Sequence, residues 1–283
     1  MKDLWIIYST RYVENENPAT RMLDEALKHE IDAELRFYDD FEIKDDILYY
    51  QKNEENDFPK IVFLRCNHIE FAEFFEKHNI RVINSSYAIK YAKDKYLAHM
   101  EVKKLDIPQI RGELLNNLTF DDIKKKYGLP FIIKERYGLQ GRNIYLIKSK
   151  FKFWFIKRNI NKEDYLVQEF IADSYGKDLR LYFAGDTLIA PVMRKNDHSF
   201  KSNLRKGGKG YNIDIPKKIV DDALKIKNAL KGEIISVDFV FNKDSFLFCE
   251  ANTNAGFNAY MALGYDVRNY FMNYIKSILD EKK

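Results

Sequence analysis

Two strand-like segments near the C-terminus, each carrying a carboxylate, constrain this chain more than any other feature. Residues 236–241 (SVDFVF) and 246–251 (FLFCEA) are rich in β-forming residues and are joined by the turn-forming segment 242–245, a pattern that predicts a β-hairpin. Asp238 and Glu250 would lie side by side on paired strands, with Asn252 close by. Two carboxylates and an amide oxygen form an anionic site that suits Mg²⁺, which usually shares such ligands with substrate phosphates. We therefore expect a phosphate-handling enzyme.

The first 90 residues alternate predicted strands and helices, which indicates a small parallel α/β unit. We expect the polar, acidic stretch 41–58 to be a loop or short helix. The expected strands are 4–9, 33–39, 61–66 and 81–84, and the expected helices are 18–29 and 68–78.

The remaining two thirds of the chain combine hairpins with flanking helices, which indicates an α+β architecture. A helix pair precedes a turn at Pro108. The expected strands are 129–137, 143–149, 165–171, 178–185 and 187–194, and the expected helices are 120–127, 151–161, 216–231 and 266–280.

A glycine-bearing turn and nearby lysines could supply the cations and the accessible backbone amides that bind the phosphates of a nucleoside triphosphate. Lys95 and Lys134 are candidate phosphate cations, and Lys134 lies late in an apolar strand that precedes Gly138 and Gly141. A glycine loop between two strands can close over phosphates, because no side chain obstructs its backbone amides. The alternatives are an ordinary hairpin turn and, since Lys95 lies in a lysine-rich helix, a solvated helix face.

Downstream residues extend the pocket that we expect for a nucleotide. Glu169 and Phe170 end a strand that could contact an adenine and a ribose, and Asp178 and Arg180 alternate with leucines, so both project to one face. Arg194 and the run Lys201, Ser202 and Asn203 follow, and Asn203 could contact phosphate or metal.

An ordered set of these motifs resembles the ATP-grasp superfamily, and most closely its ribosomal-protein-S6-modification-like (RimK-type) glutamate ligase branch. The motifs are DK at 94–95, FIIKERYGLQG, QEFIADSYGKDLR, KSNLRKGG and VDF followed by EAN, and the resemblance covers about residues 61–265. It implies an ATP-grasp fold at 91–283, with a central subdomain at about 91–168 and a C-terminal one at about 169–283, preceded by an α/β domain at 1–90. Ala251 and Lys201 replace the valine and arginine that are usual in the family, and the tail after Gly256 departs more, which leaves substrate choice open.

The resemblance also implies an activity, in which a carboxylate is joined to an amine through an acyl phosphate, with ATP and two Mg²⁺ or Mn²⁺ ions. Glutamate or another amino acid would be added to a protein tail, a peptide or a small carboxylate. The implied roles are ATP binding for Lys95, Lys134, Gly138, Gly141, Glu169, Phe170, Asp178, Lys201, Ser202 and Asn203, metal binding for Asp238, Glu250 and Asn252, and stabilisation of the reacting group for Arg180 and Arg194.

Two other polar residues of the N-terminal region could have either a functional or a structural role. Arg65 and Asn84 lie at the ends of predicted strands and are candidates for substrate contact, and a structural role is the alternative. The five histidines show no metal-ligand spacing, so we expect surface or packing roles for them. Cys66 and Cys249 lie in apolar segments, which favours free thiols over a disulfide and argues against a thiol mechanism.

Composition narrows the class of protein. The 47 basic and 43 acidic residues are interspersed, which argues against nucleic acid as a partner, and no segment has the apolar length of a signal peptide or membrane span. We expect a cytoplasmic protein with no membrane partner, and a homo-oligomer stays open. The rival hypotheses are a catalytically silent ATP-binding module and an RNA-associated protein, the latter suggested by the basic cluster at 201–209.

Overall fold

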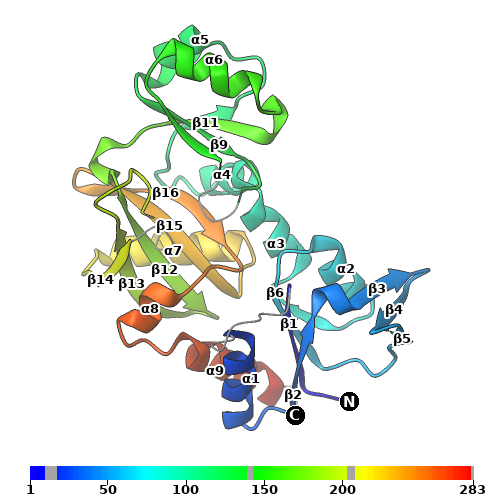
Figure 1. The fold of residues 1–283 in the computed structure, drawn as a ribbon. Helices are drawn as coiled ribbons and strands as arrows, with labels where there is room; N and C mark the ends of the chain where they lie inside the picture. Colours follow the sequence, from blue (N-terminus) through cyan, green and yellow to red (C-terminus); the bar gives the residue numbers. More distant parts are fainter. Residues whose placement is uncertain (10–17, 139–142, 203–207, 282–283) are drawn as a thin grey trace.

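The computed structural model describes residues 1–9, 18–138, 143–202 and 208–281. Its N-terminal part is a parallel sheet in the order β2-β1-β6-β7, as the alternation of strands and helices predicted (Figure 1). Every residue of the apolar strand β1 is buried, since both faces of a parallel sheet are covered. The strands are β1 (Leu4–Tyr8), β2 (Ala33–Phe37), β6 (Ile61–Arg65) and β7 (Arg81–Ile83), and the helices are α1 (Pro18–Lys28) and α2 (Ile69–Lys77).

The expectation of a loop or short helix at 41–58 is wrong. This stretch forms a small antiparallel sheet of β3 (Phe41–Lys44), β4 (Ile47–Tyr50) and β5 (Asn53–Glu54), preceded by the 3₁₀ turn η1 (Tyr38–Asp40). Asp45 and Asp46 make the β3–β4 turn with φ of 50° and 64°, a conformation that aspartate tolerates better than most residues. The guanidinium of Arg36 lies 3.5 Å from the ring centroid of Trp5 and 4.5 Å from that of Tyr50, and so connects this sheet to the N-terminal core.

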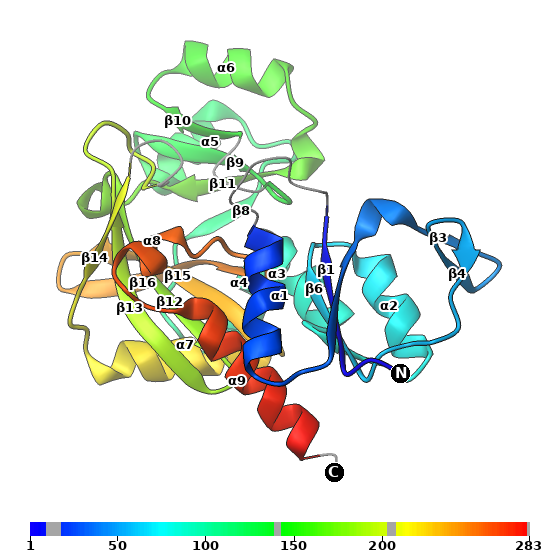
Figure 2. The ribbon, with the colours of Figure 1, turned by 60° about the horizontal axis from the view of Figure 1, so that its bottom comes forward.

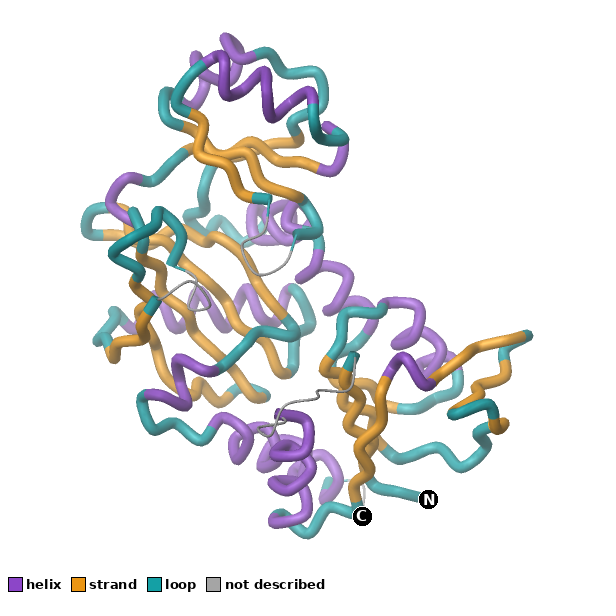
Figure 3. The backbone as a smooth tube through the Cα atoms, viewed as in Figure 1, coloured by secondary structure: helices purple, strands orange, loops and turns teal. Residues whose placement is uncertain are grey.

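A second, antiparallel sheet has the order β10-β9-β11-β8, and helices α5 and α6 cover one of its faces (Figures 1 and 3). Two helices, α3 (Ser86–Lys93) and α4 (Lys95–Lys103), lead into it from the N-terminal sheet. The remaining elements of this part are β8 (Gly112–Leu114), α5 (Phe120–Tyr127), β9 (Phe131–Glu135), β10 (Ile144–Ile147), α6 (Lys150–Arg158), η2 (Lys162–Asp164) and β11 (Tyr165–Glu169).

The C-terminal part is a sheet in the order β14-β13-β12-β15-β16 that has a separate core on each face. Helix α7 packs with one core, and α8 and α9 pack with the other. The elements are η3 (Ala172–Ser174), β12 (Lys177–Ala184), β13 (Thr187–Lys195), β14 (Lys209–Asn212), α7 (Lys217–Ala229), β15 (Ile234–Asn242), β16 (Ser245–Asn252), α8 (Asn258–Ala262) and α9 (Val267–Asp280).

The N-terminal and C-terminal sheets share one hydrophobic core, in which α1 and α9 pack together (Figure 2). Arg81 Nη2 donates to Glu233 Oε2 at 2.6 Å, and Tyr274 Oη donates to the same oxygen at 2.6 Å. These contacts join the parallel sheet to the turn before β15 and to helix α9. Among the described residues, no helix combines the length and the apolar character that crossing a membrane requires.

Candidate active site

The predicted carboxylate hairpin is confirmed as β15 and β16, and it lies beside β12 and β13 in one sheet. Asp238 is directly opposite Glu250 on one side and Arg180 on the other. On β12, Asp178 lies two residues before Arg180 and is opposite Arg194 of β13. Since side chains two apart on a strand share a face, these charged groups gather on one face of the sheet.

Asp238 is the centre of a buried ion-pair network. Its Oδ1 accepts a hydrogen bond from Arg180 Nε at 2.7 Å, and its Oδ2 accepts from Arg180 Nη2 at 2.5 Å and from Arg194 Nη2 at 2.9 Å. Arg194 also donates to both oxygens of Asp178, at 2.7 and 2.6 Å. Burial by itself raises the pKa of the Asp238 carboxyl, but the two guanidinium groups outweigh burial and hold this pKa below its ordinary value.

An irregularity in β16 sets the position of Glu250. The register shifts after the Asp238–Glu250 pair, so that Phe239 is opposite Phe248 and Cys249 is an extra residue. A bulge of this kind bends the strand and reorients its side chains. Asn252 Nδ2 lies 3.3 Å from Glu250 Oε1, so the amide and the carboxylate are neighbours.

The chemistry of this donor set fits a hard divalent cation that is shared with phosphate. The described residues contain no group of three or more His, Cys, Asp or Glu that could hold a metal ion by themselves. Asp238 Oδ1 accepts only one of the hydrogen bonds described above, so a lone pair remains on it. Asp238, Glu250 and Asn252 can thus supply oxygen ligands to Mg²⁺, and the remaining positions would need substrate oxygens or water.

Lys95 interacts electrostatically with Glu250 and with the neighbouring Lys134. Both lysines are buried, with 7% and 4% of their surface exposed. Lys95 Nζ donates to the carbonyl oxygen of Gly138. Burial lowers the pKa of Lys95, Glu250 acts in the opposite direction, and the neighbouring charge of Lys134 lowers it further. Two cations therefore lie on the Glu250 side of the site, where phosphate charge could be neutralised.

Asp94 fixes Lys95 at the first position of α4. Its carboxylate caps the helix by accepting from the backbone amides of Tyr96 and Leu97 at 3.0 and 3.2 Å. It also accepts two hydrogen bonds from Arg136, at 2.8 and 2.6 Å, just after β9. The start of α4 is thereby joined to the strand that carries Lys134.

Glu169 and Phe170 lie at the link between the central and C-terminal sheets, as expected from their order in the chain. Glu169 is engaged by Arg111, whose backbone amide donates to it at 2.9 Å and whose Nη2 lies 2.6 Å from its carboxylate. The Phe170 ring lies edge-on to Tyr175, with 6.3 Å between centroids.

The segment that carries Lys201 and Ser202 packs against the backbone of Gly176. Gly176 has φ of 69°, and a Cβ atom there would come within 2.3 Å of the Asn196 carbonyl oxygen and 2.6 Å of that of Ser199. Only glycine permits this approach. The Ser202 hydroxyl donates to Asp178, which brings this segment to the charged face of the sheet. Two further candidates, Gly141 and Asn203, lie outside the described residues.

Arg65 and Asn84 lie where the N-terminal sheet meets the C-terminal part. Arg65 is 6% exposed and donates to the Ala255 carbonyl at 3.3 Å, while its Nε and Nη1 have no hydrogen-bond partner. Asn84 donates to the carbonyls of Ile234 and Thr253, and its oxygen accepts from the amides of Glu233 and Ile234. These bonds give Asn84 a structural role at the junction, and its role in substrate binding stays a prediction.

The sequence indicated a surface or packing role for His99 but did not predict that this residue lies near Lys134 and Glu250. His99 is one turn after Lys95 on α4, and its Nε2 lies 3.0 Å from the Cys249 carbonyl oxygen and 3.2 Å from Gln168 Nε2. Burial first, and then Lys134, lowers its pKa from 6.5 to about 4, so the ring is neutral at pH 7. The four-residue spacing from Lys95 was the available signal, since it places both side chains on one helix face.

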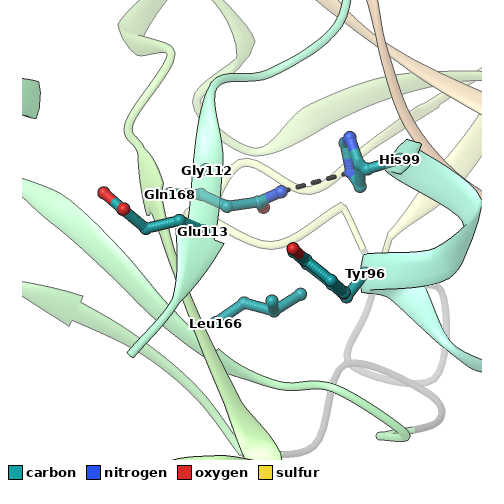
Figure 4. Close-up of a pocket in the computed structure, with 6 residues that line it drawn as sticks. All are labelled: Tyr96, His99, Gly112, Glu113, Leu166 and Gln168. Atoms are coloured by element: carbon teal, nitrogen blue, oxygen red, sulfur yellow. Dashed lines mark hydrogen bonds between the residues drawn. The ribbon is translucent and has the colours of Figure 1, made fainter. Parts of the chain in front are cut away.

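The side chains of His99, Gln168 and Tyr96 meet at a cavity of about 10 Å³, which Gly112, Glu113 and Leu166 also line (Figure 4). This is room for about one water molecule and is far too small for a nucleotide. The cavity is therefore a packing feature of the joint between α4, β8 and β11.

Cys66 and Cys249 are both free, as the sequence indicated. Burial raises the pKa of each thiol to about 12. Because the thiolate is the nucleophile, neither residue is poised for covalent catalysis.

Comparison with known proteins gives relatives along most of the chain. MG012 of Mycoplasma genitalium is 28% identical over 270 residues, covering 90% of this chain and 92% of that protein. Beta-citrylglutamate synthase B of Danio rerio is 27% identical over 215 residues, covering 73% of this chain and 53% of the synthase. N-acetylaspartylglutamate synthase A of Homo sapiens is 25% identical over 244 residues, covering 80% of this chain and 62% of the synthase.

Solved structures of similar fold cover nearly the whole chain. An ATP-grasp protein with a RimK domain from Sphaerobacter thermophilus superposes with a TM-score of 0.73 at 15% identity, covering 96% of this chain and 99% of that one. The ATP-grasp ligase PsnB in complex with a minimal precursor gives a TM-score of 0.74 at 12% identity, with 98% of each chain covered. Residues 90–275 match the family described as the RimK-like ATP-grasp domain. The chain thus belongs to the RimK-like branch of the ATP-grasp superfamily and is an ATP-grasp ligase.

Proposed function

We propose that this ligase uses MgATP to join a substrate carboxylate to the amino group of an amino acid, forming an amide. The observation that carries this proposal is the buried group of Arg180, Arg194 and Asp238 beside Glu250 on one sheet face. Fixed cations next to metal-ligand carboxylates are what a reaction between anionic substrates requires, because they offset developing negative charge without reorganising.

The reaction would proceed in two steps. The substrate carboxylate attacks the γ-phosphorus of ATP, ADP leaves, and an acyl phosphate forms. An amino group then attacks the acyl carbon, phosphate leaves, and an amide forms with release of a proton. We assign Arg180 and Arg194 to steadying the acyl phosphate and the oxyanion that forms when the amine adds.

The nucleotide would lie between the central and C-terminal sheets. We assign Lys95 and Lys134 to its phosphates, with Gly138, Gly141 and Asn203 as further contacts. Glu169 and Phe170 would contact the adenine and ribose, Asp178 would contact the ribose, and Lys201 and Ser202 would contact the nucleotide. When bound, Mg²⁺ held by Asp238, Glu250 and Asn252 would neutralise the β- and γ-phosphates, and we propose two ions.

The amino-acid substrate is proposed to be glutamate or a close analogue, joined to a small carboxylate, a peptide or a protein tail. Support comes from relatives named as synthases of beta-citrylglutamate and of N-acetylaspartylglutamate. Arg65 is the candidate contact for a substrate carboxylate. It is a buried cation in which two of the three guanidinium nitrogens, Nε and Nη1, have no hydrogen-bond partner, and it makes no ion pair in the described part of the chain.

An ADP-release assay tests the function. The full chain is incubated with MgATP and each amino acid, alone and with small carboxylates or peptides, and products are identified by mass. Amino-acid-dependent ADP release with a product equal to the two substrates minus water is the expected result. ATP binding without release under any condition would favour a silent module, and steeply salt-dependent RNA binding would favour the RNA-associated alternative.

Arg65→Gln separates the substrate contact from nucleotide binding. Because Arg65 is assigned to a substrate carboxylate, we expect KM for the amino acid or the acceptor to rise about tenfold or more, with KM for ATP unchanged. A similar rise in both KM values, or none in either, would show that Arg65 only supports the fold.

A further inference from the structure

Helix α6 exposes three large aromatic side chains on the outside of the central part. Phe151, Trp154 and Phe155 are 78%, 57% and 56% exposed, while Phe153 is the one buried residue of this helix. Positions 151, 154 and 155 are spaced to share one helix face. Both ribbon views place α6 at an outer end of the molecule, away from the C-terminal sheet that carries the carboxylates (Figures 1 and 2). The active site therefore does not account for these rings.

The same segment is strongly basic. Residues 148–158 (KSKFKFWFIKR) contain five lysines or arginines and no acidic residue. Lys152 and Arg158 are exposed, and the Arg158 guanidinium lies 5.4 Å from the centre of a Trp154 ring. Lys150 is engaged by Asp121 at 2.9 Å. We define the aromatic–basic patch as Phe151, Lys152, Trp154, Phe155 and Arg158.

Contrary to the expectation from composition that the protein has no membrane partner, we propose that the aromatic–basic patch binds the surface of an anionic lipid bilayer. Aromatic rings insert at the headgroup level and flanking cations interact with lipid phosphates, which is the composition that helices lying on membranes use. The exposed rings project from the surface, and a fluid bilayer closes around projecting groups without needing a matching groove. A second copy of the chain is disfavoured, since pairing the patch with itself would bring like charges together.

The position of the two tryptophans allows a direct test. The chain has two tryptophans, and Trp5 is fully buried, so a change in fluorescence on ligand addition reports Trp154. The full chain is titrated with vesicles of phosphatidylcholine alone and of an equal mixture with phosphatidylglycerol. We expect a blue shift and protection from acrylamide with the anionic vesicles only, both reversed by high salt.

Two paired variants test the patch itself. Phe151→Ser/Phe155→Ser keeps Trp154 as the reporter and is expected to weaken vesicle binding about tenfold or more. Lys152→Glu/Arg158→Glu should abolish vesicle binding. The control is Lys217→Glu/Lys225→Glu, which makes the same change of charge at exposed positions of α7 and should leave most of the vesicle binding. Circular dichroism of each variant checks that the fold is retained.

Three outcomes would overturn the proposal. The first is unchanged Trp154 fluorescence with every vesicle, and the second is equal binding to neutral and anionic vesicles. The third is a shift with poly-L-glutamate but not with vesicles, which would make an acidic polypeptide the partner. None of these outcomes bears on ligase activity, so the two proposals are tested separately.

Discussion

At the scale of single residues, the two carboxylates of the site differ in burial and in partners. Asp238 is 1% exposed and is hydrogen-bonded to two arginines, while Glu250 is only partly buried. If both residues acted only as metal ligands, alanine at either position would abolish turnover and leave the fold intact. The ion pairs of Asp238 change that expectation for one of the two residues.

We predict that Asp238→Asn and Glu250→Gln both lower kcat at least about a hundredfold, since each removes charge from the proposed metal ligands. Asp238→Asn should also lower the free energy of unfolding by about 3 kcal/mol, because it leaves buried guanidinium groups without their counter-charge. Glu250→Gln should change it by less than about 1 kcal/mol. Turnover assays and urea unfolding of both variants measure this contrast, and equal stability losses would argue against it.

The lowered pKa of His99 predicts how the free energy of unfolding changes with pH. Its folded-state pKa is about 4 and its ordinary value is 6.5, so between these values the unfolded chain binds a proton that the folded chain does not. The His99 contribution to stability is therefore complete above pH 6.5 and falls as the pH drops towards 4, by up to about 3 kcal/mol.

Urea unfolding between pH 7.5 and pH 4 should show this loss in the wild type and a smaller one in His99→Gln. His198→Gln, at an exposed turn position, is the matched control and should follow the wild type. If the wild-type and His99→Gln curves remain parallel, His99 does not titrate as described.

At the scale of elements, the start of α4 depends on its capping residue. Asp94 both caps the helix and pairs with Arg136, so it connects α4 to β9 and positions Lys95. We predict that Asp94→Ala lowers the free energy of unfolding by about 2–3 kcal/mol and raises KM for ATP, because the cap and the ion pair are both lost.

Asp94→Asn separates these contributions. Asparagine is also a good capping residue but lacks the charge. We expect a smaller loss of stability than in the alanine variant, with KM for ATP still raised, and isothermal titration with a non-hydrolysable ATP analogue provides the check. Wild-type nucleotide affinity in both variants would contradict a role for this cap in placing Lys95.

At the scale of the whole molecule, the proposed boundary at residues 90 and 91 cuts through a shared core. Residues of β1, β6 and α1 pack in one cluster with β12, α8 and α9. We therefore propose that residues 1–90 form a recognisable unit of chain topology but depend on the rest of the chain for stability.

We predict that a fragment of residues 1–90 lacks a cooperative unfolding transition, whereas the full chain unfolds in one. Asn84→Ala in the full chain should lower the free energy of unfolding by about 2–4 kcal/mol, because it removes the hydrogen-bond acceptor of the partly buried Glu233 amide and the buried Ile234 amide. Calorimetry measures the unfolding transition of the fragment and the stability of the Asn84→Ala variant. A cooperatively folded fragment would show that the N-terminal sheet is an independent domain.

The sequence by itself determined the local elements and the family. Apolar alternation and turn residues identified the β15–β16 hairpin, because strand periodicity and turn chemistry are properties of short segments. The ordered motifs identified the ATP-grasp fold and the candidate residues. The small sheet of β3 to β5 was not predicted, since its strands are short and gain much of their stability from packing.

Only the tertiary structure decided which charged groups are partners. Asp238 pairs with Arg180 and Arg194 because the strand order is β13-β12-β15-β16, which brings together residues 44 and 58 positions apart in the chain. The tertiary structure likewise showed that Asn84 hydrogen-bonds to backbone groups about 150 residues away in the chain. It also showed that the His99 ring lies within hydrogen-bonding distance of the Cys249 carbonyl oxygen. Such pairings depend on long-range packing, which no local period or motif in a single sequence encodes.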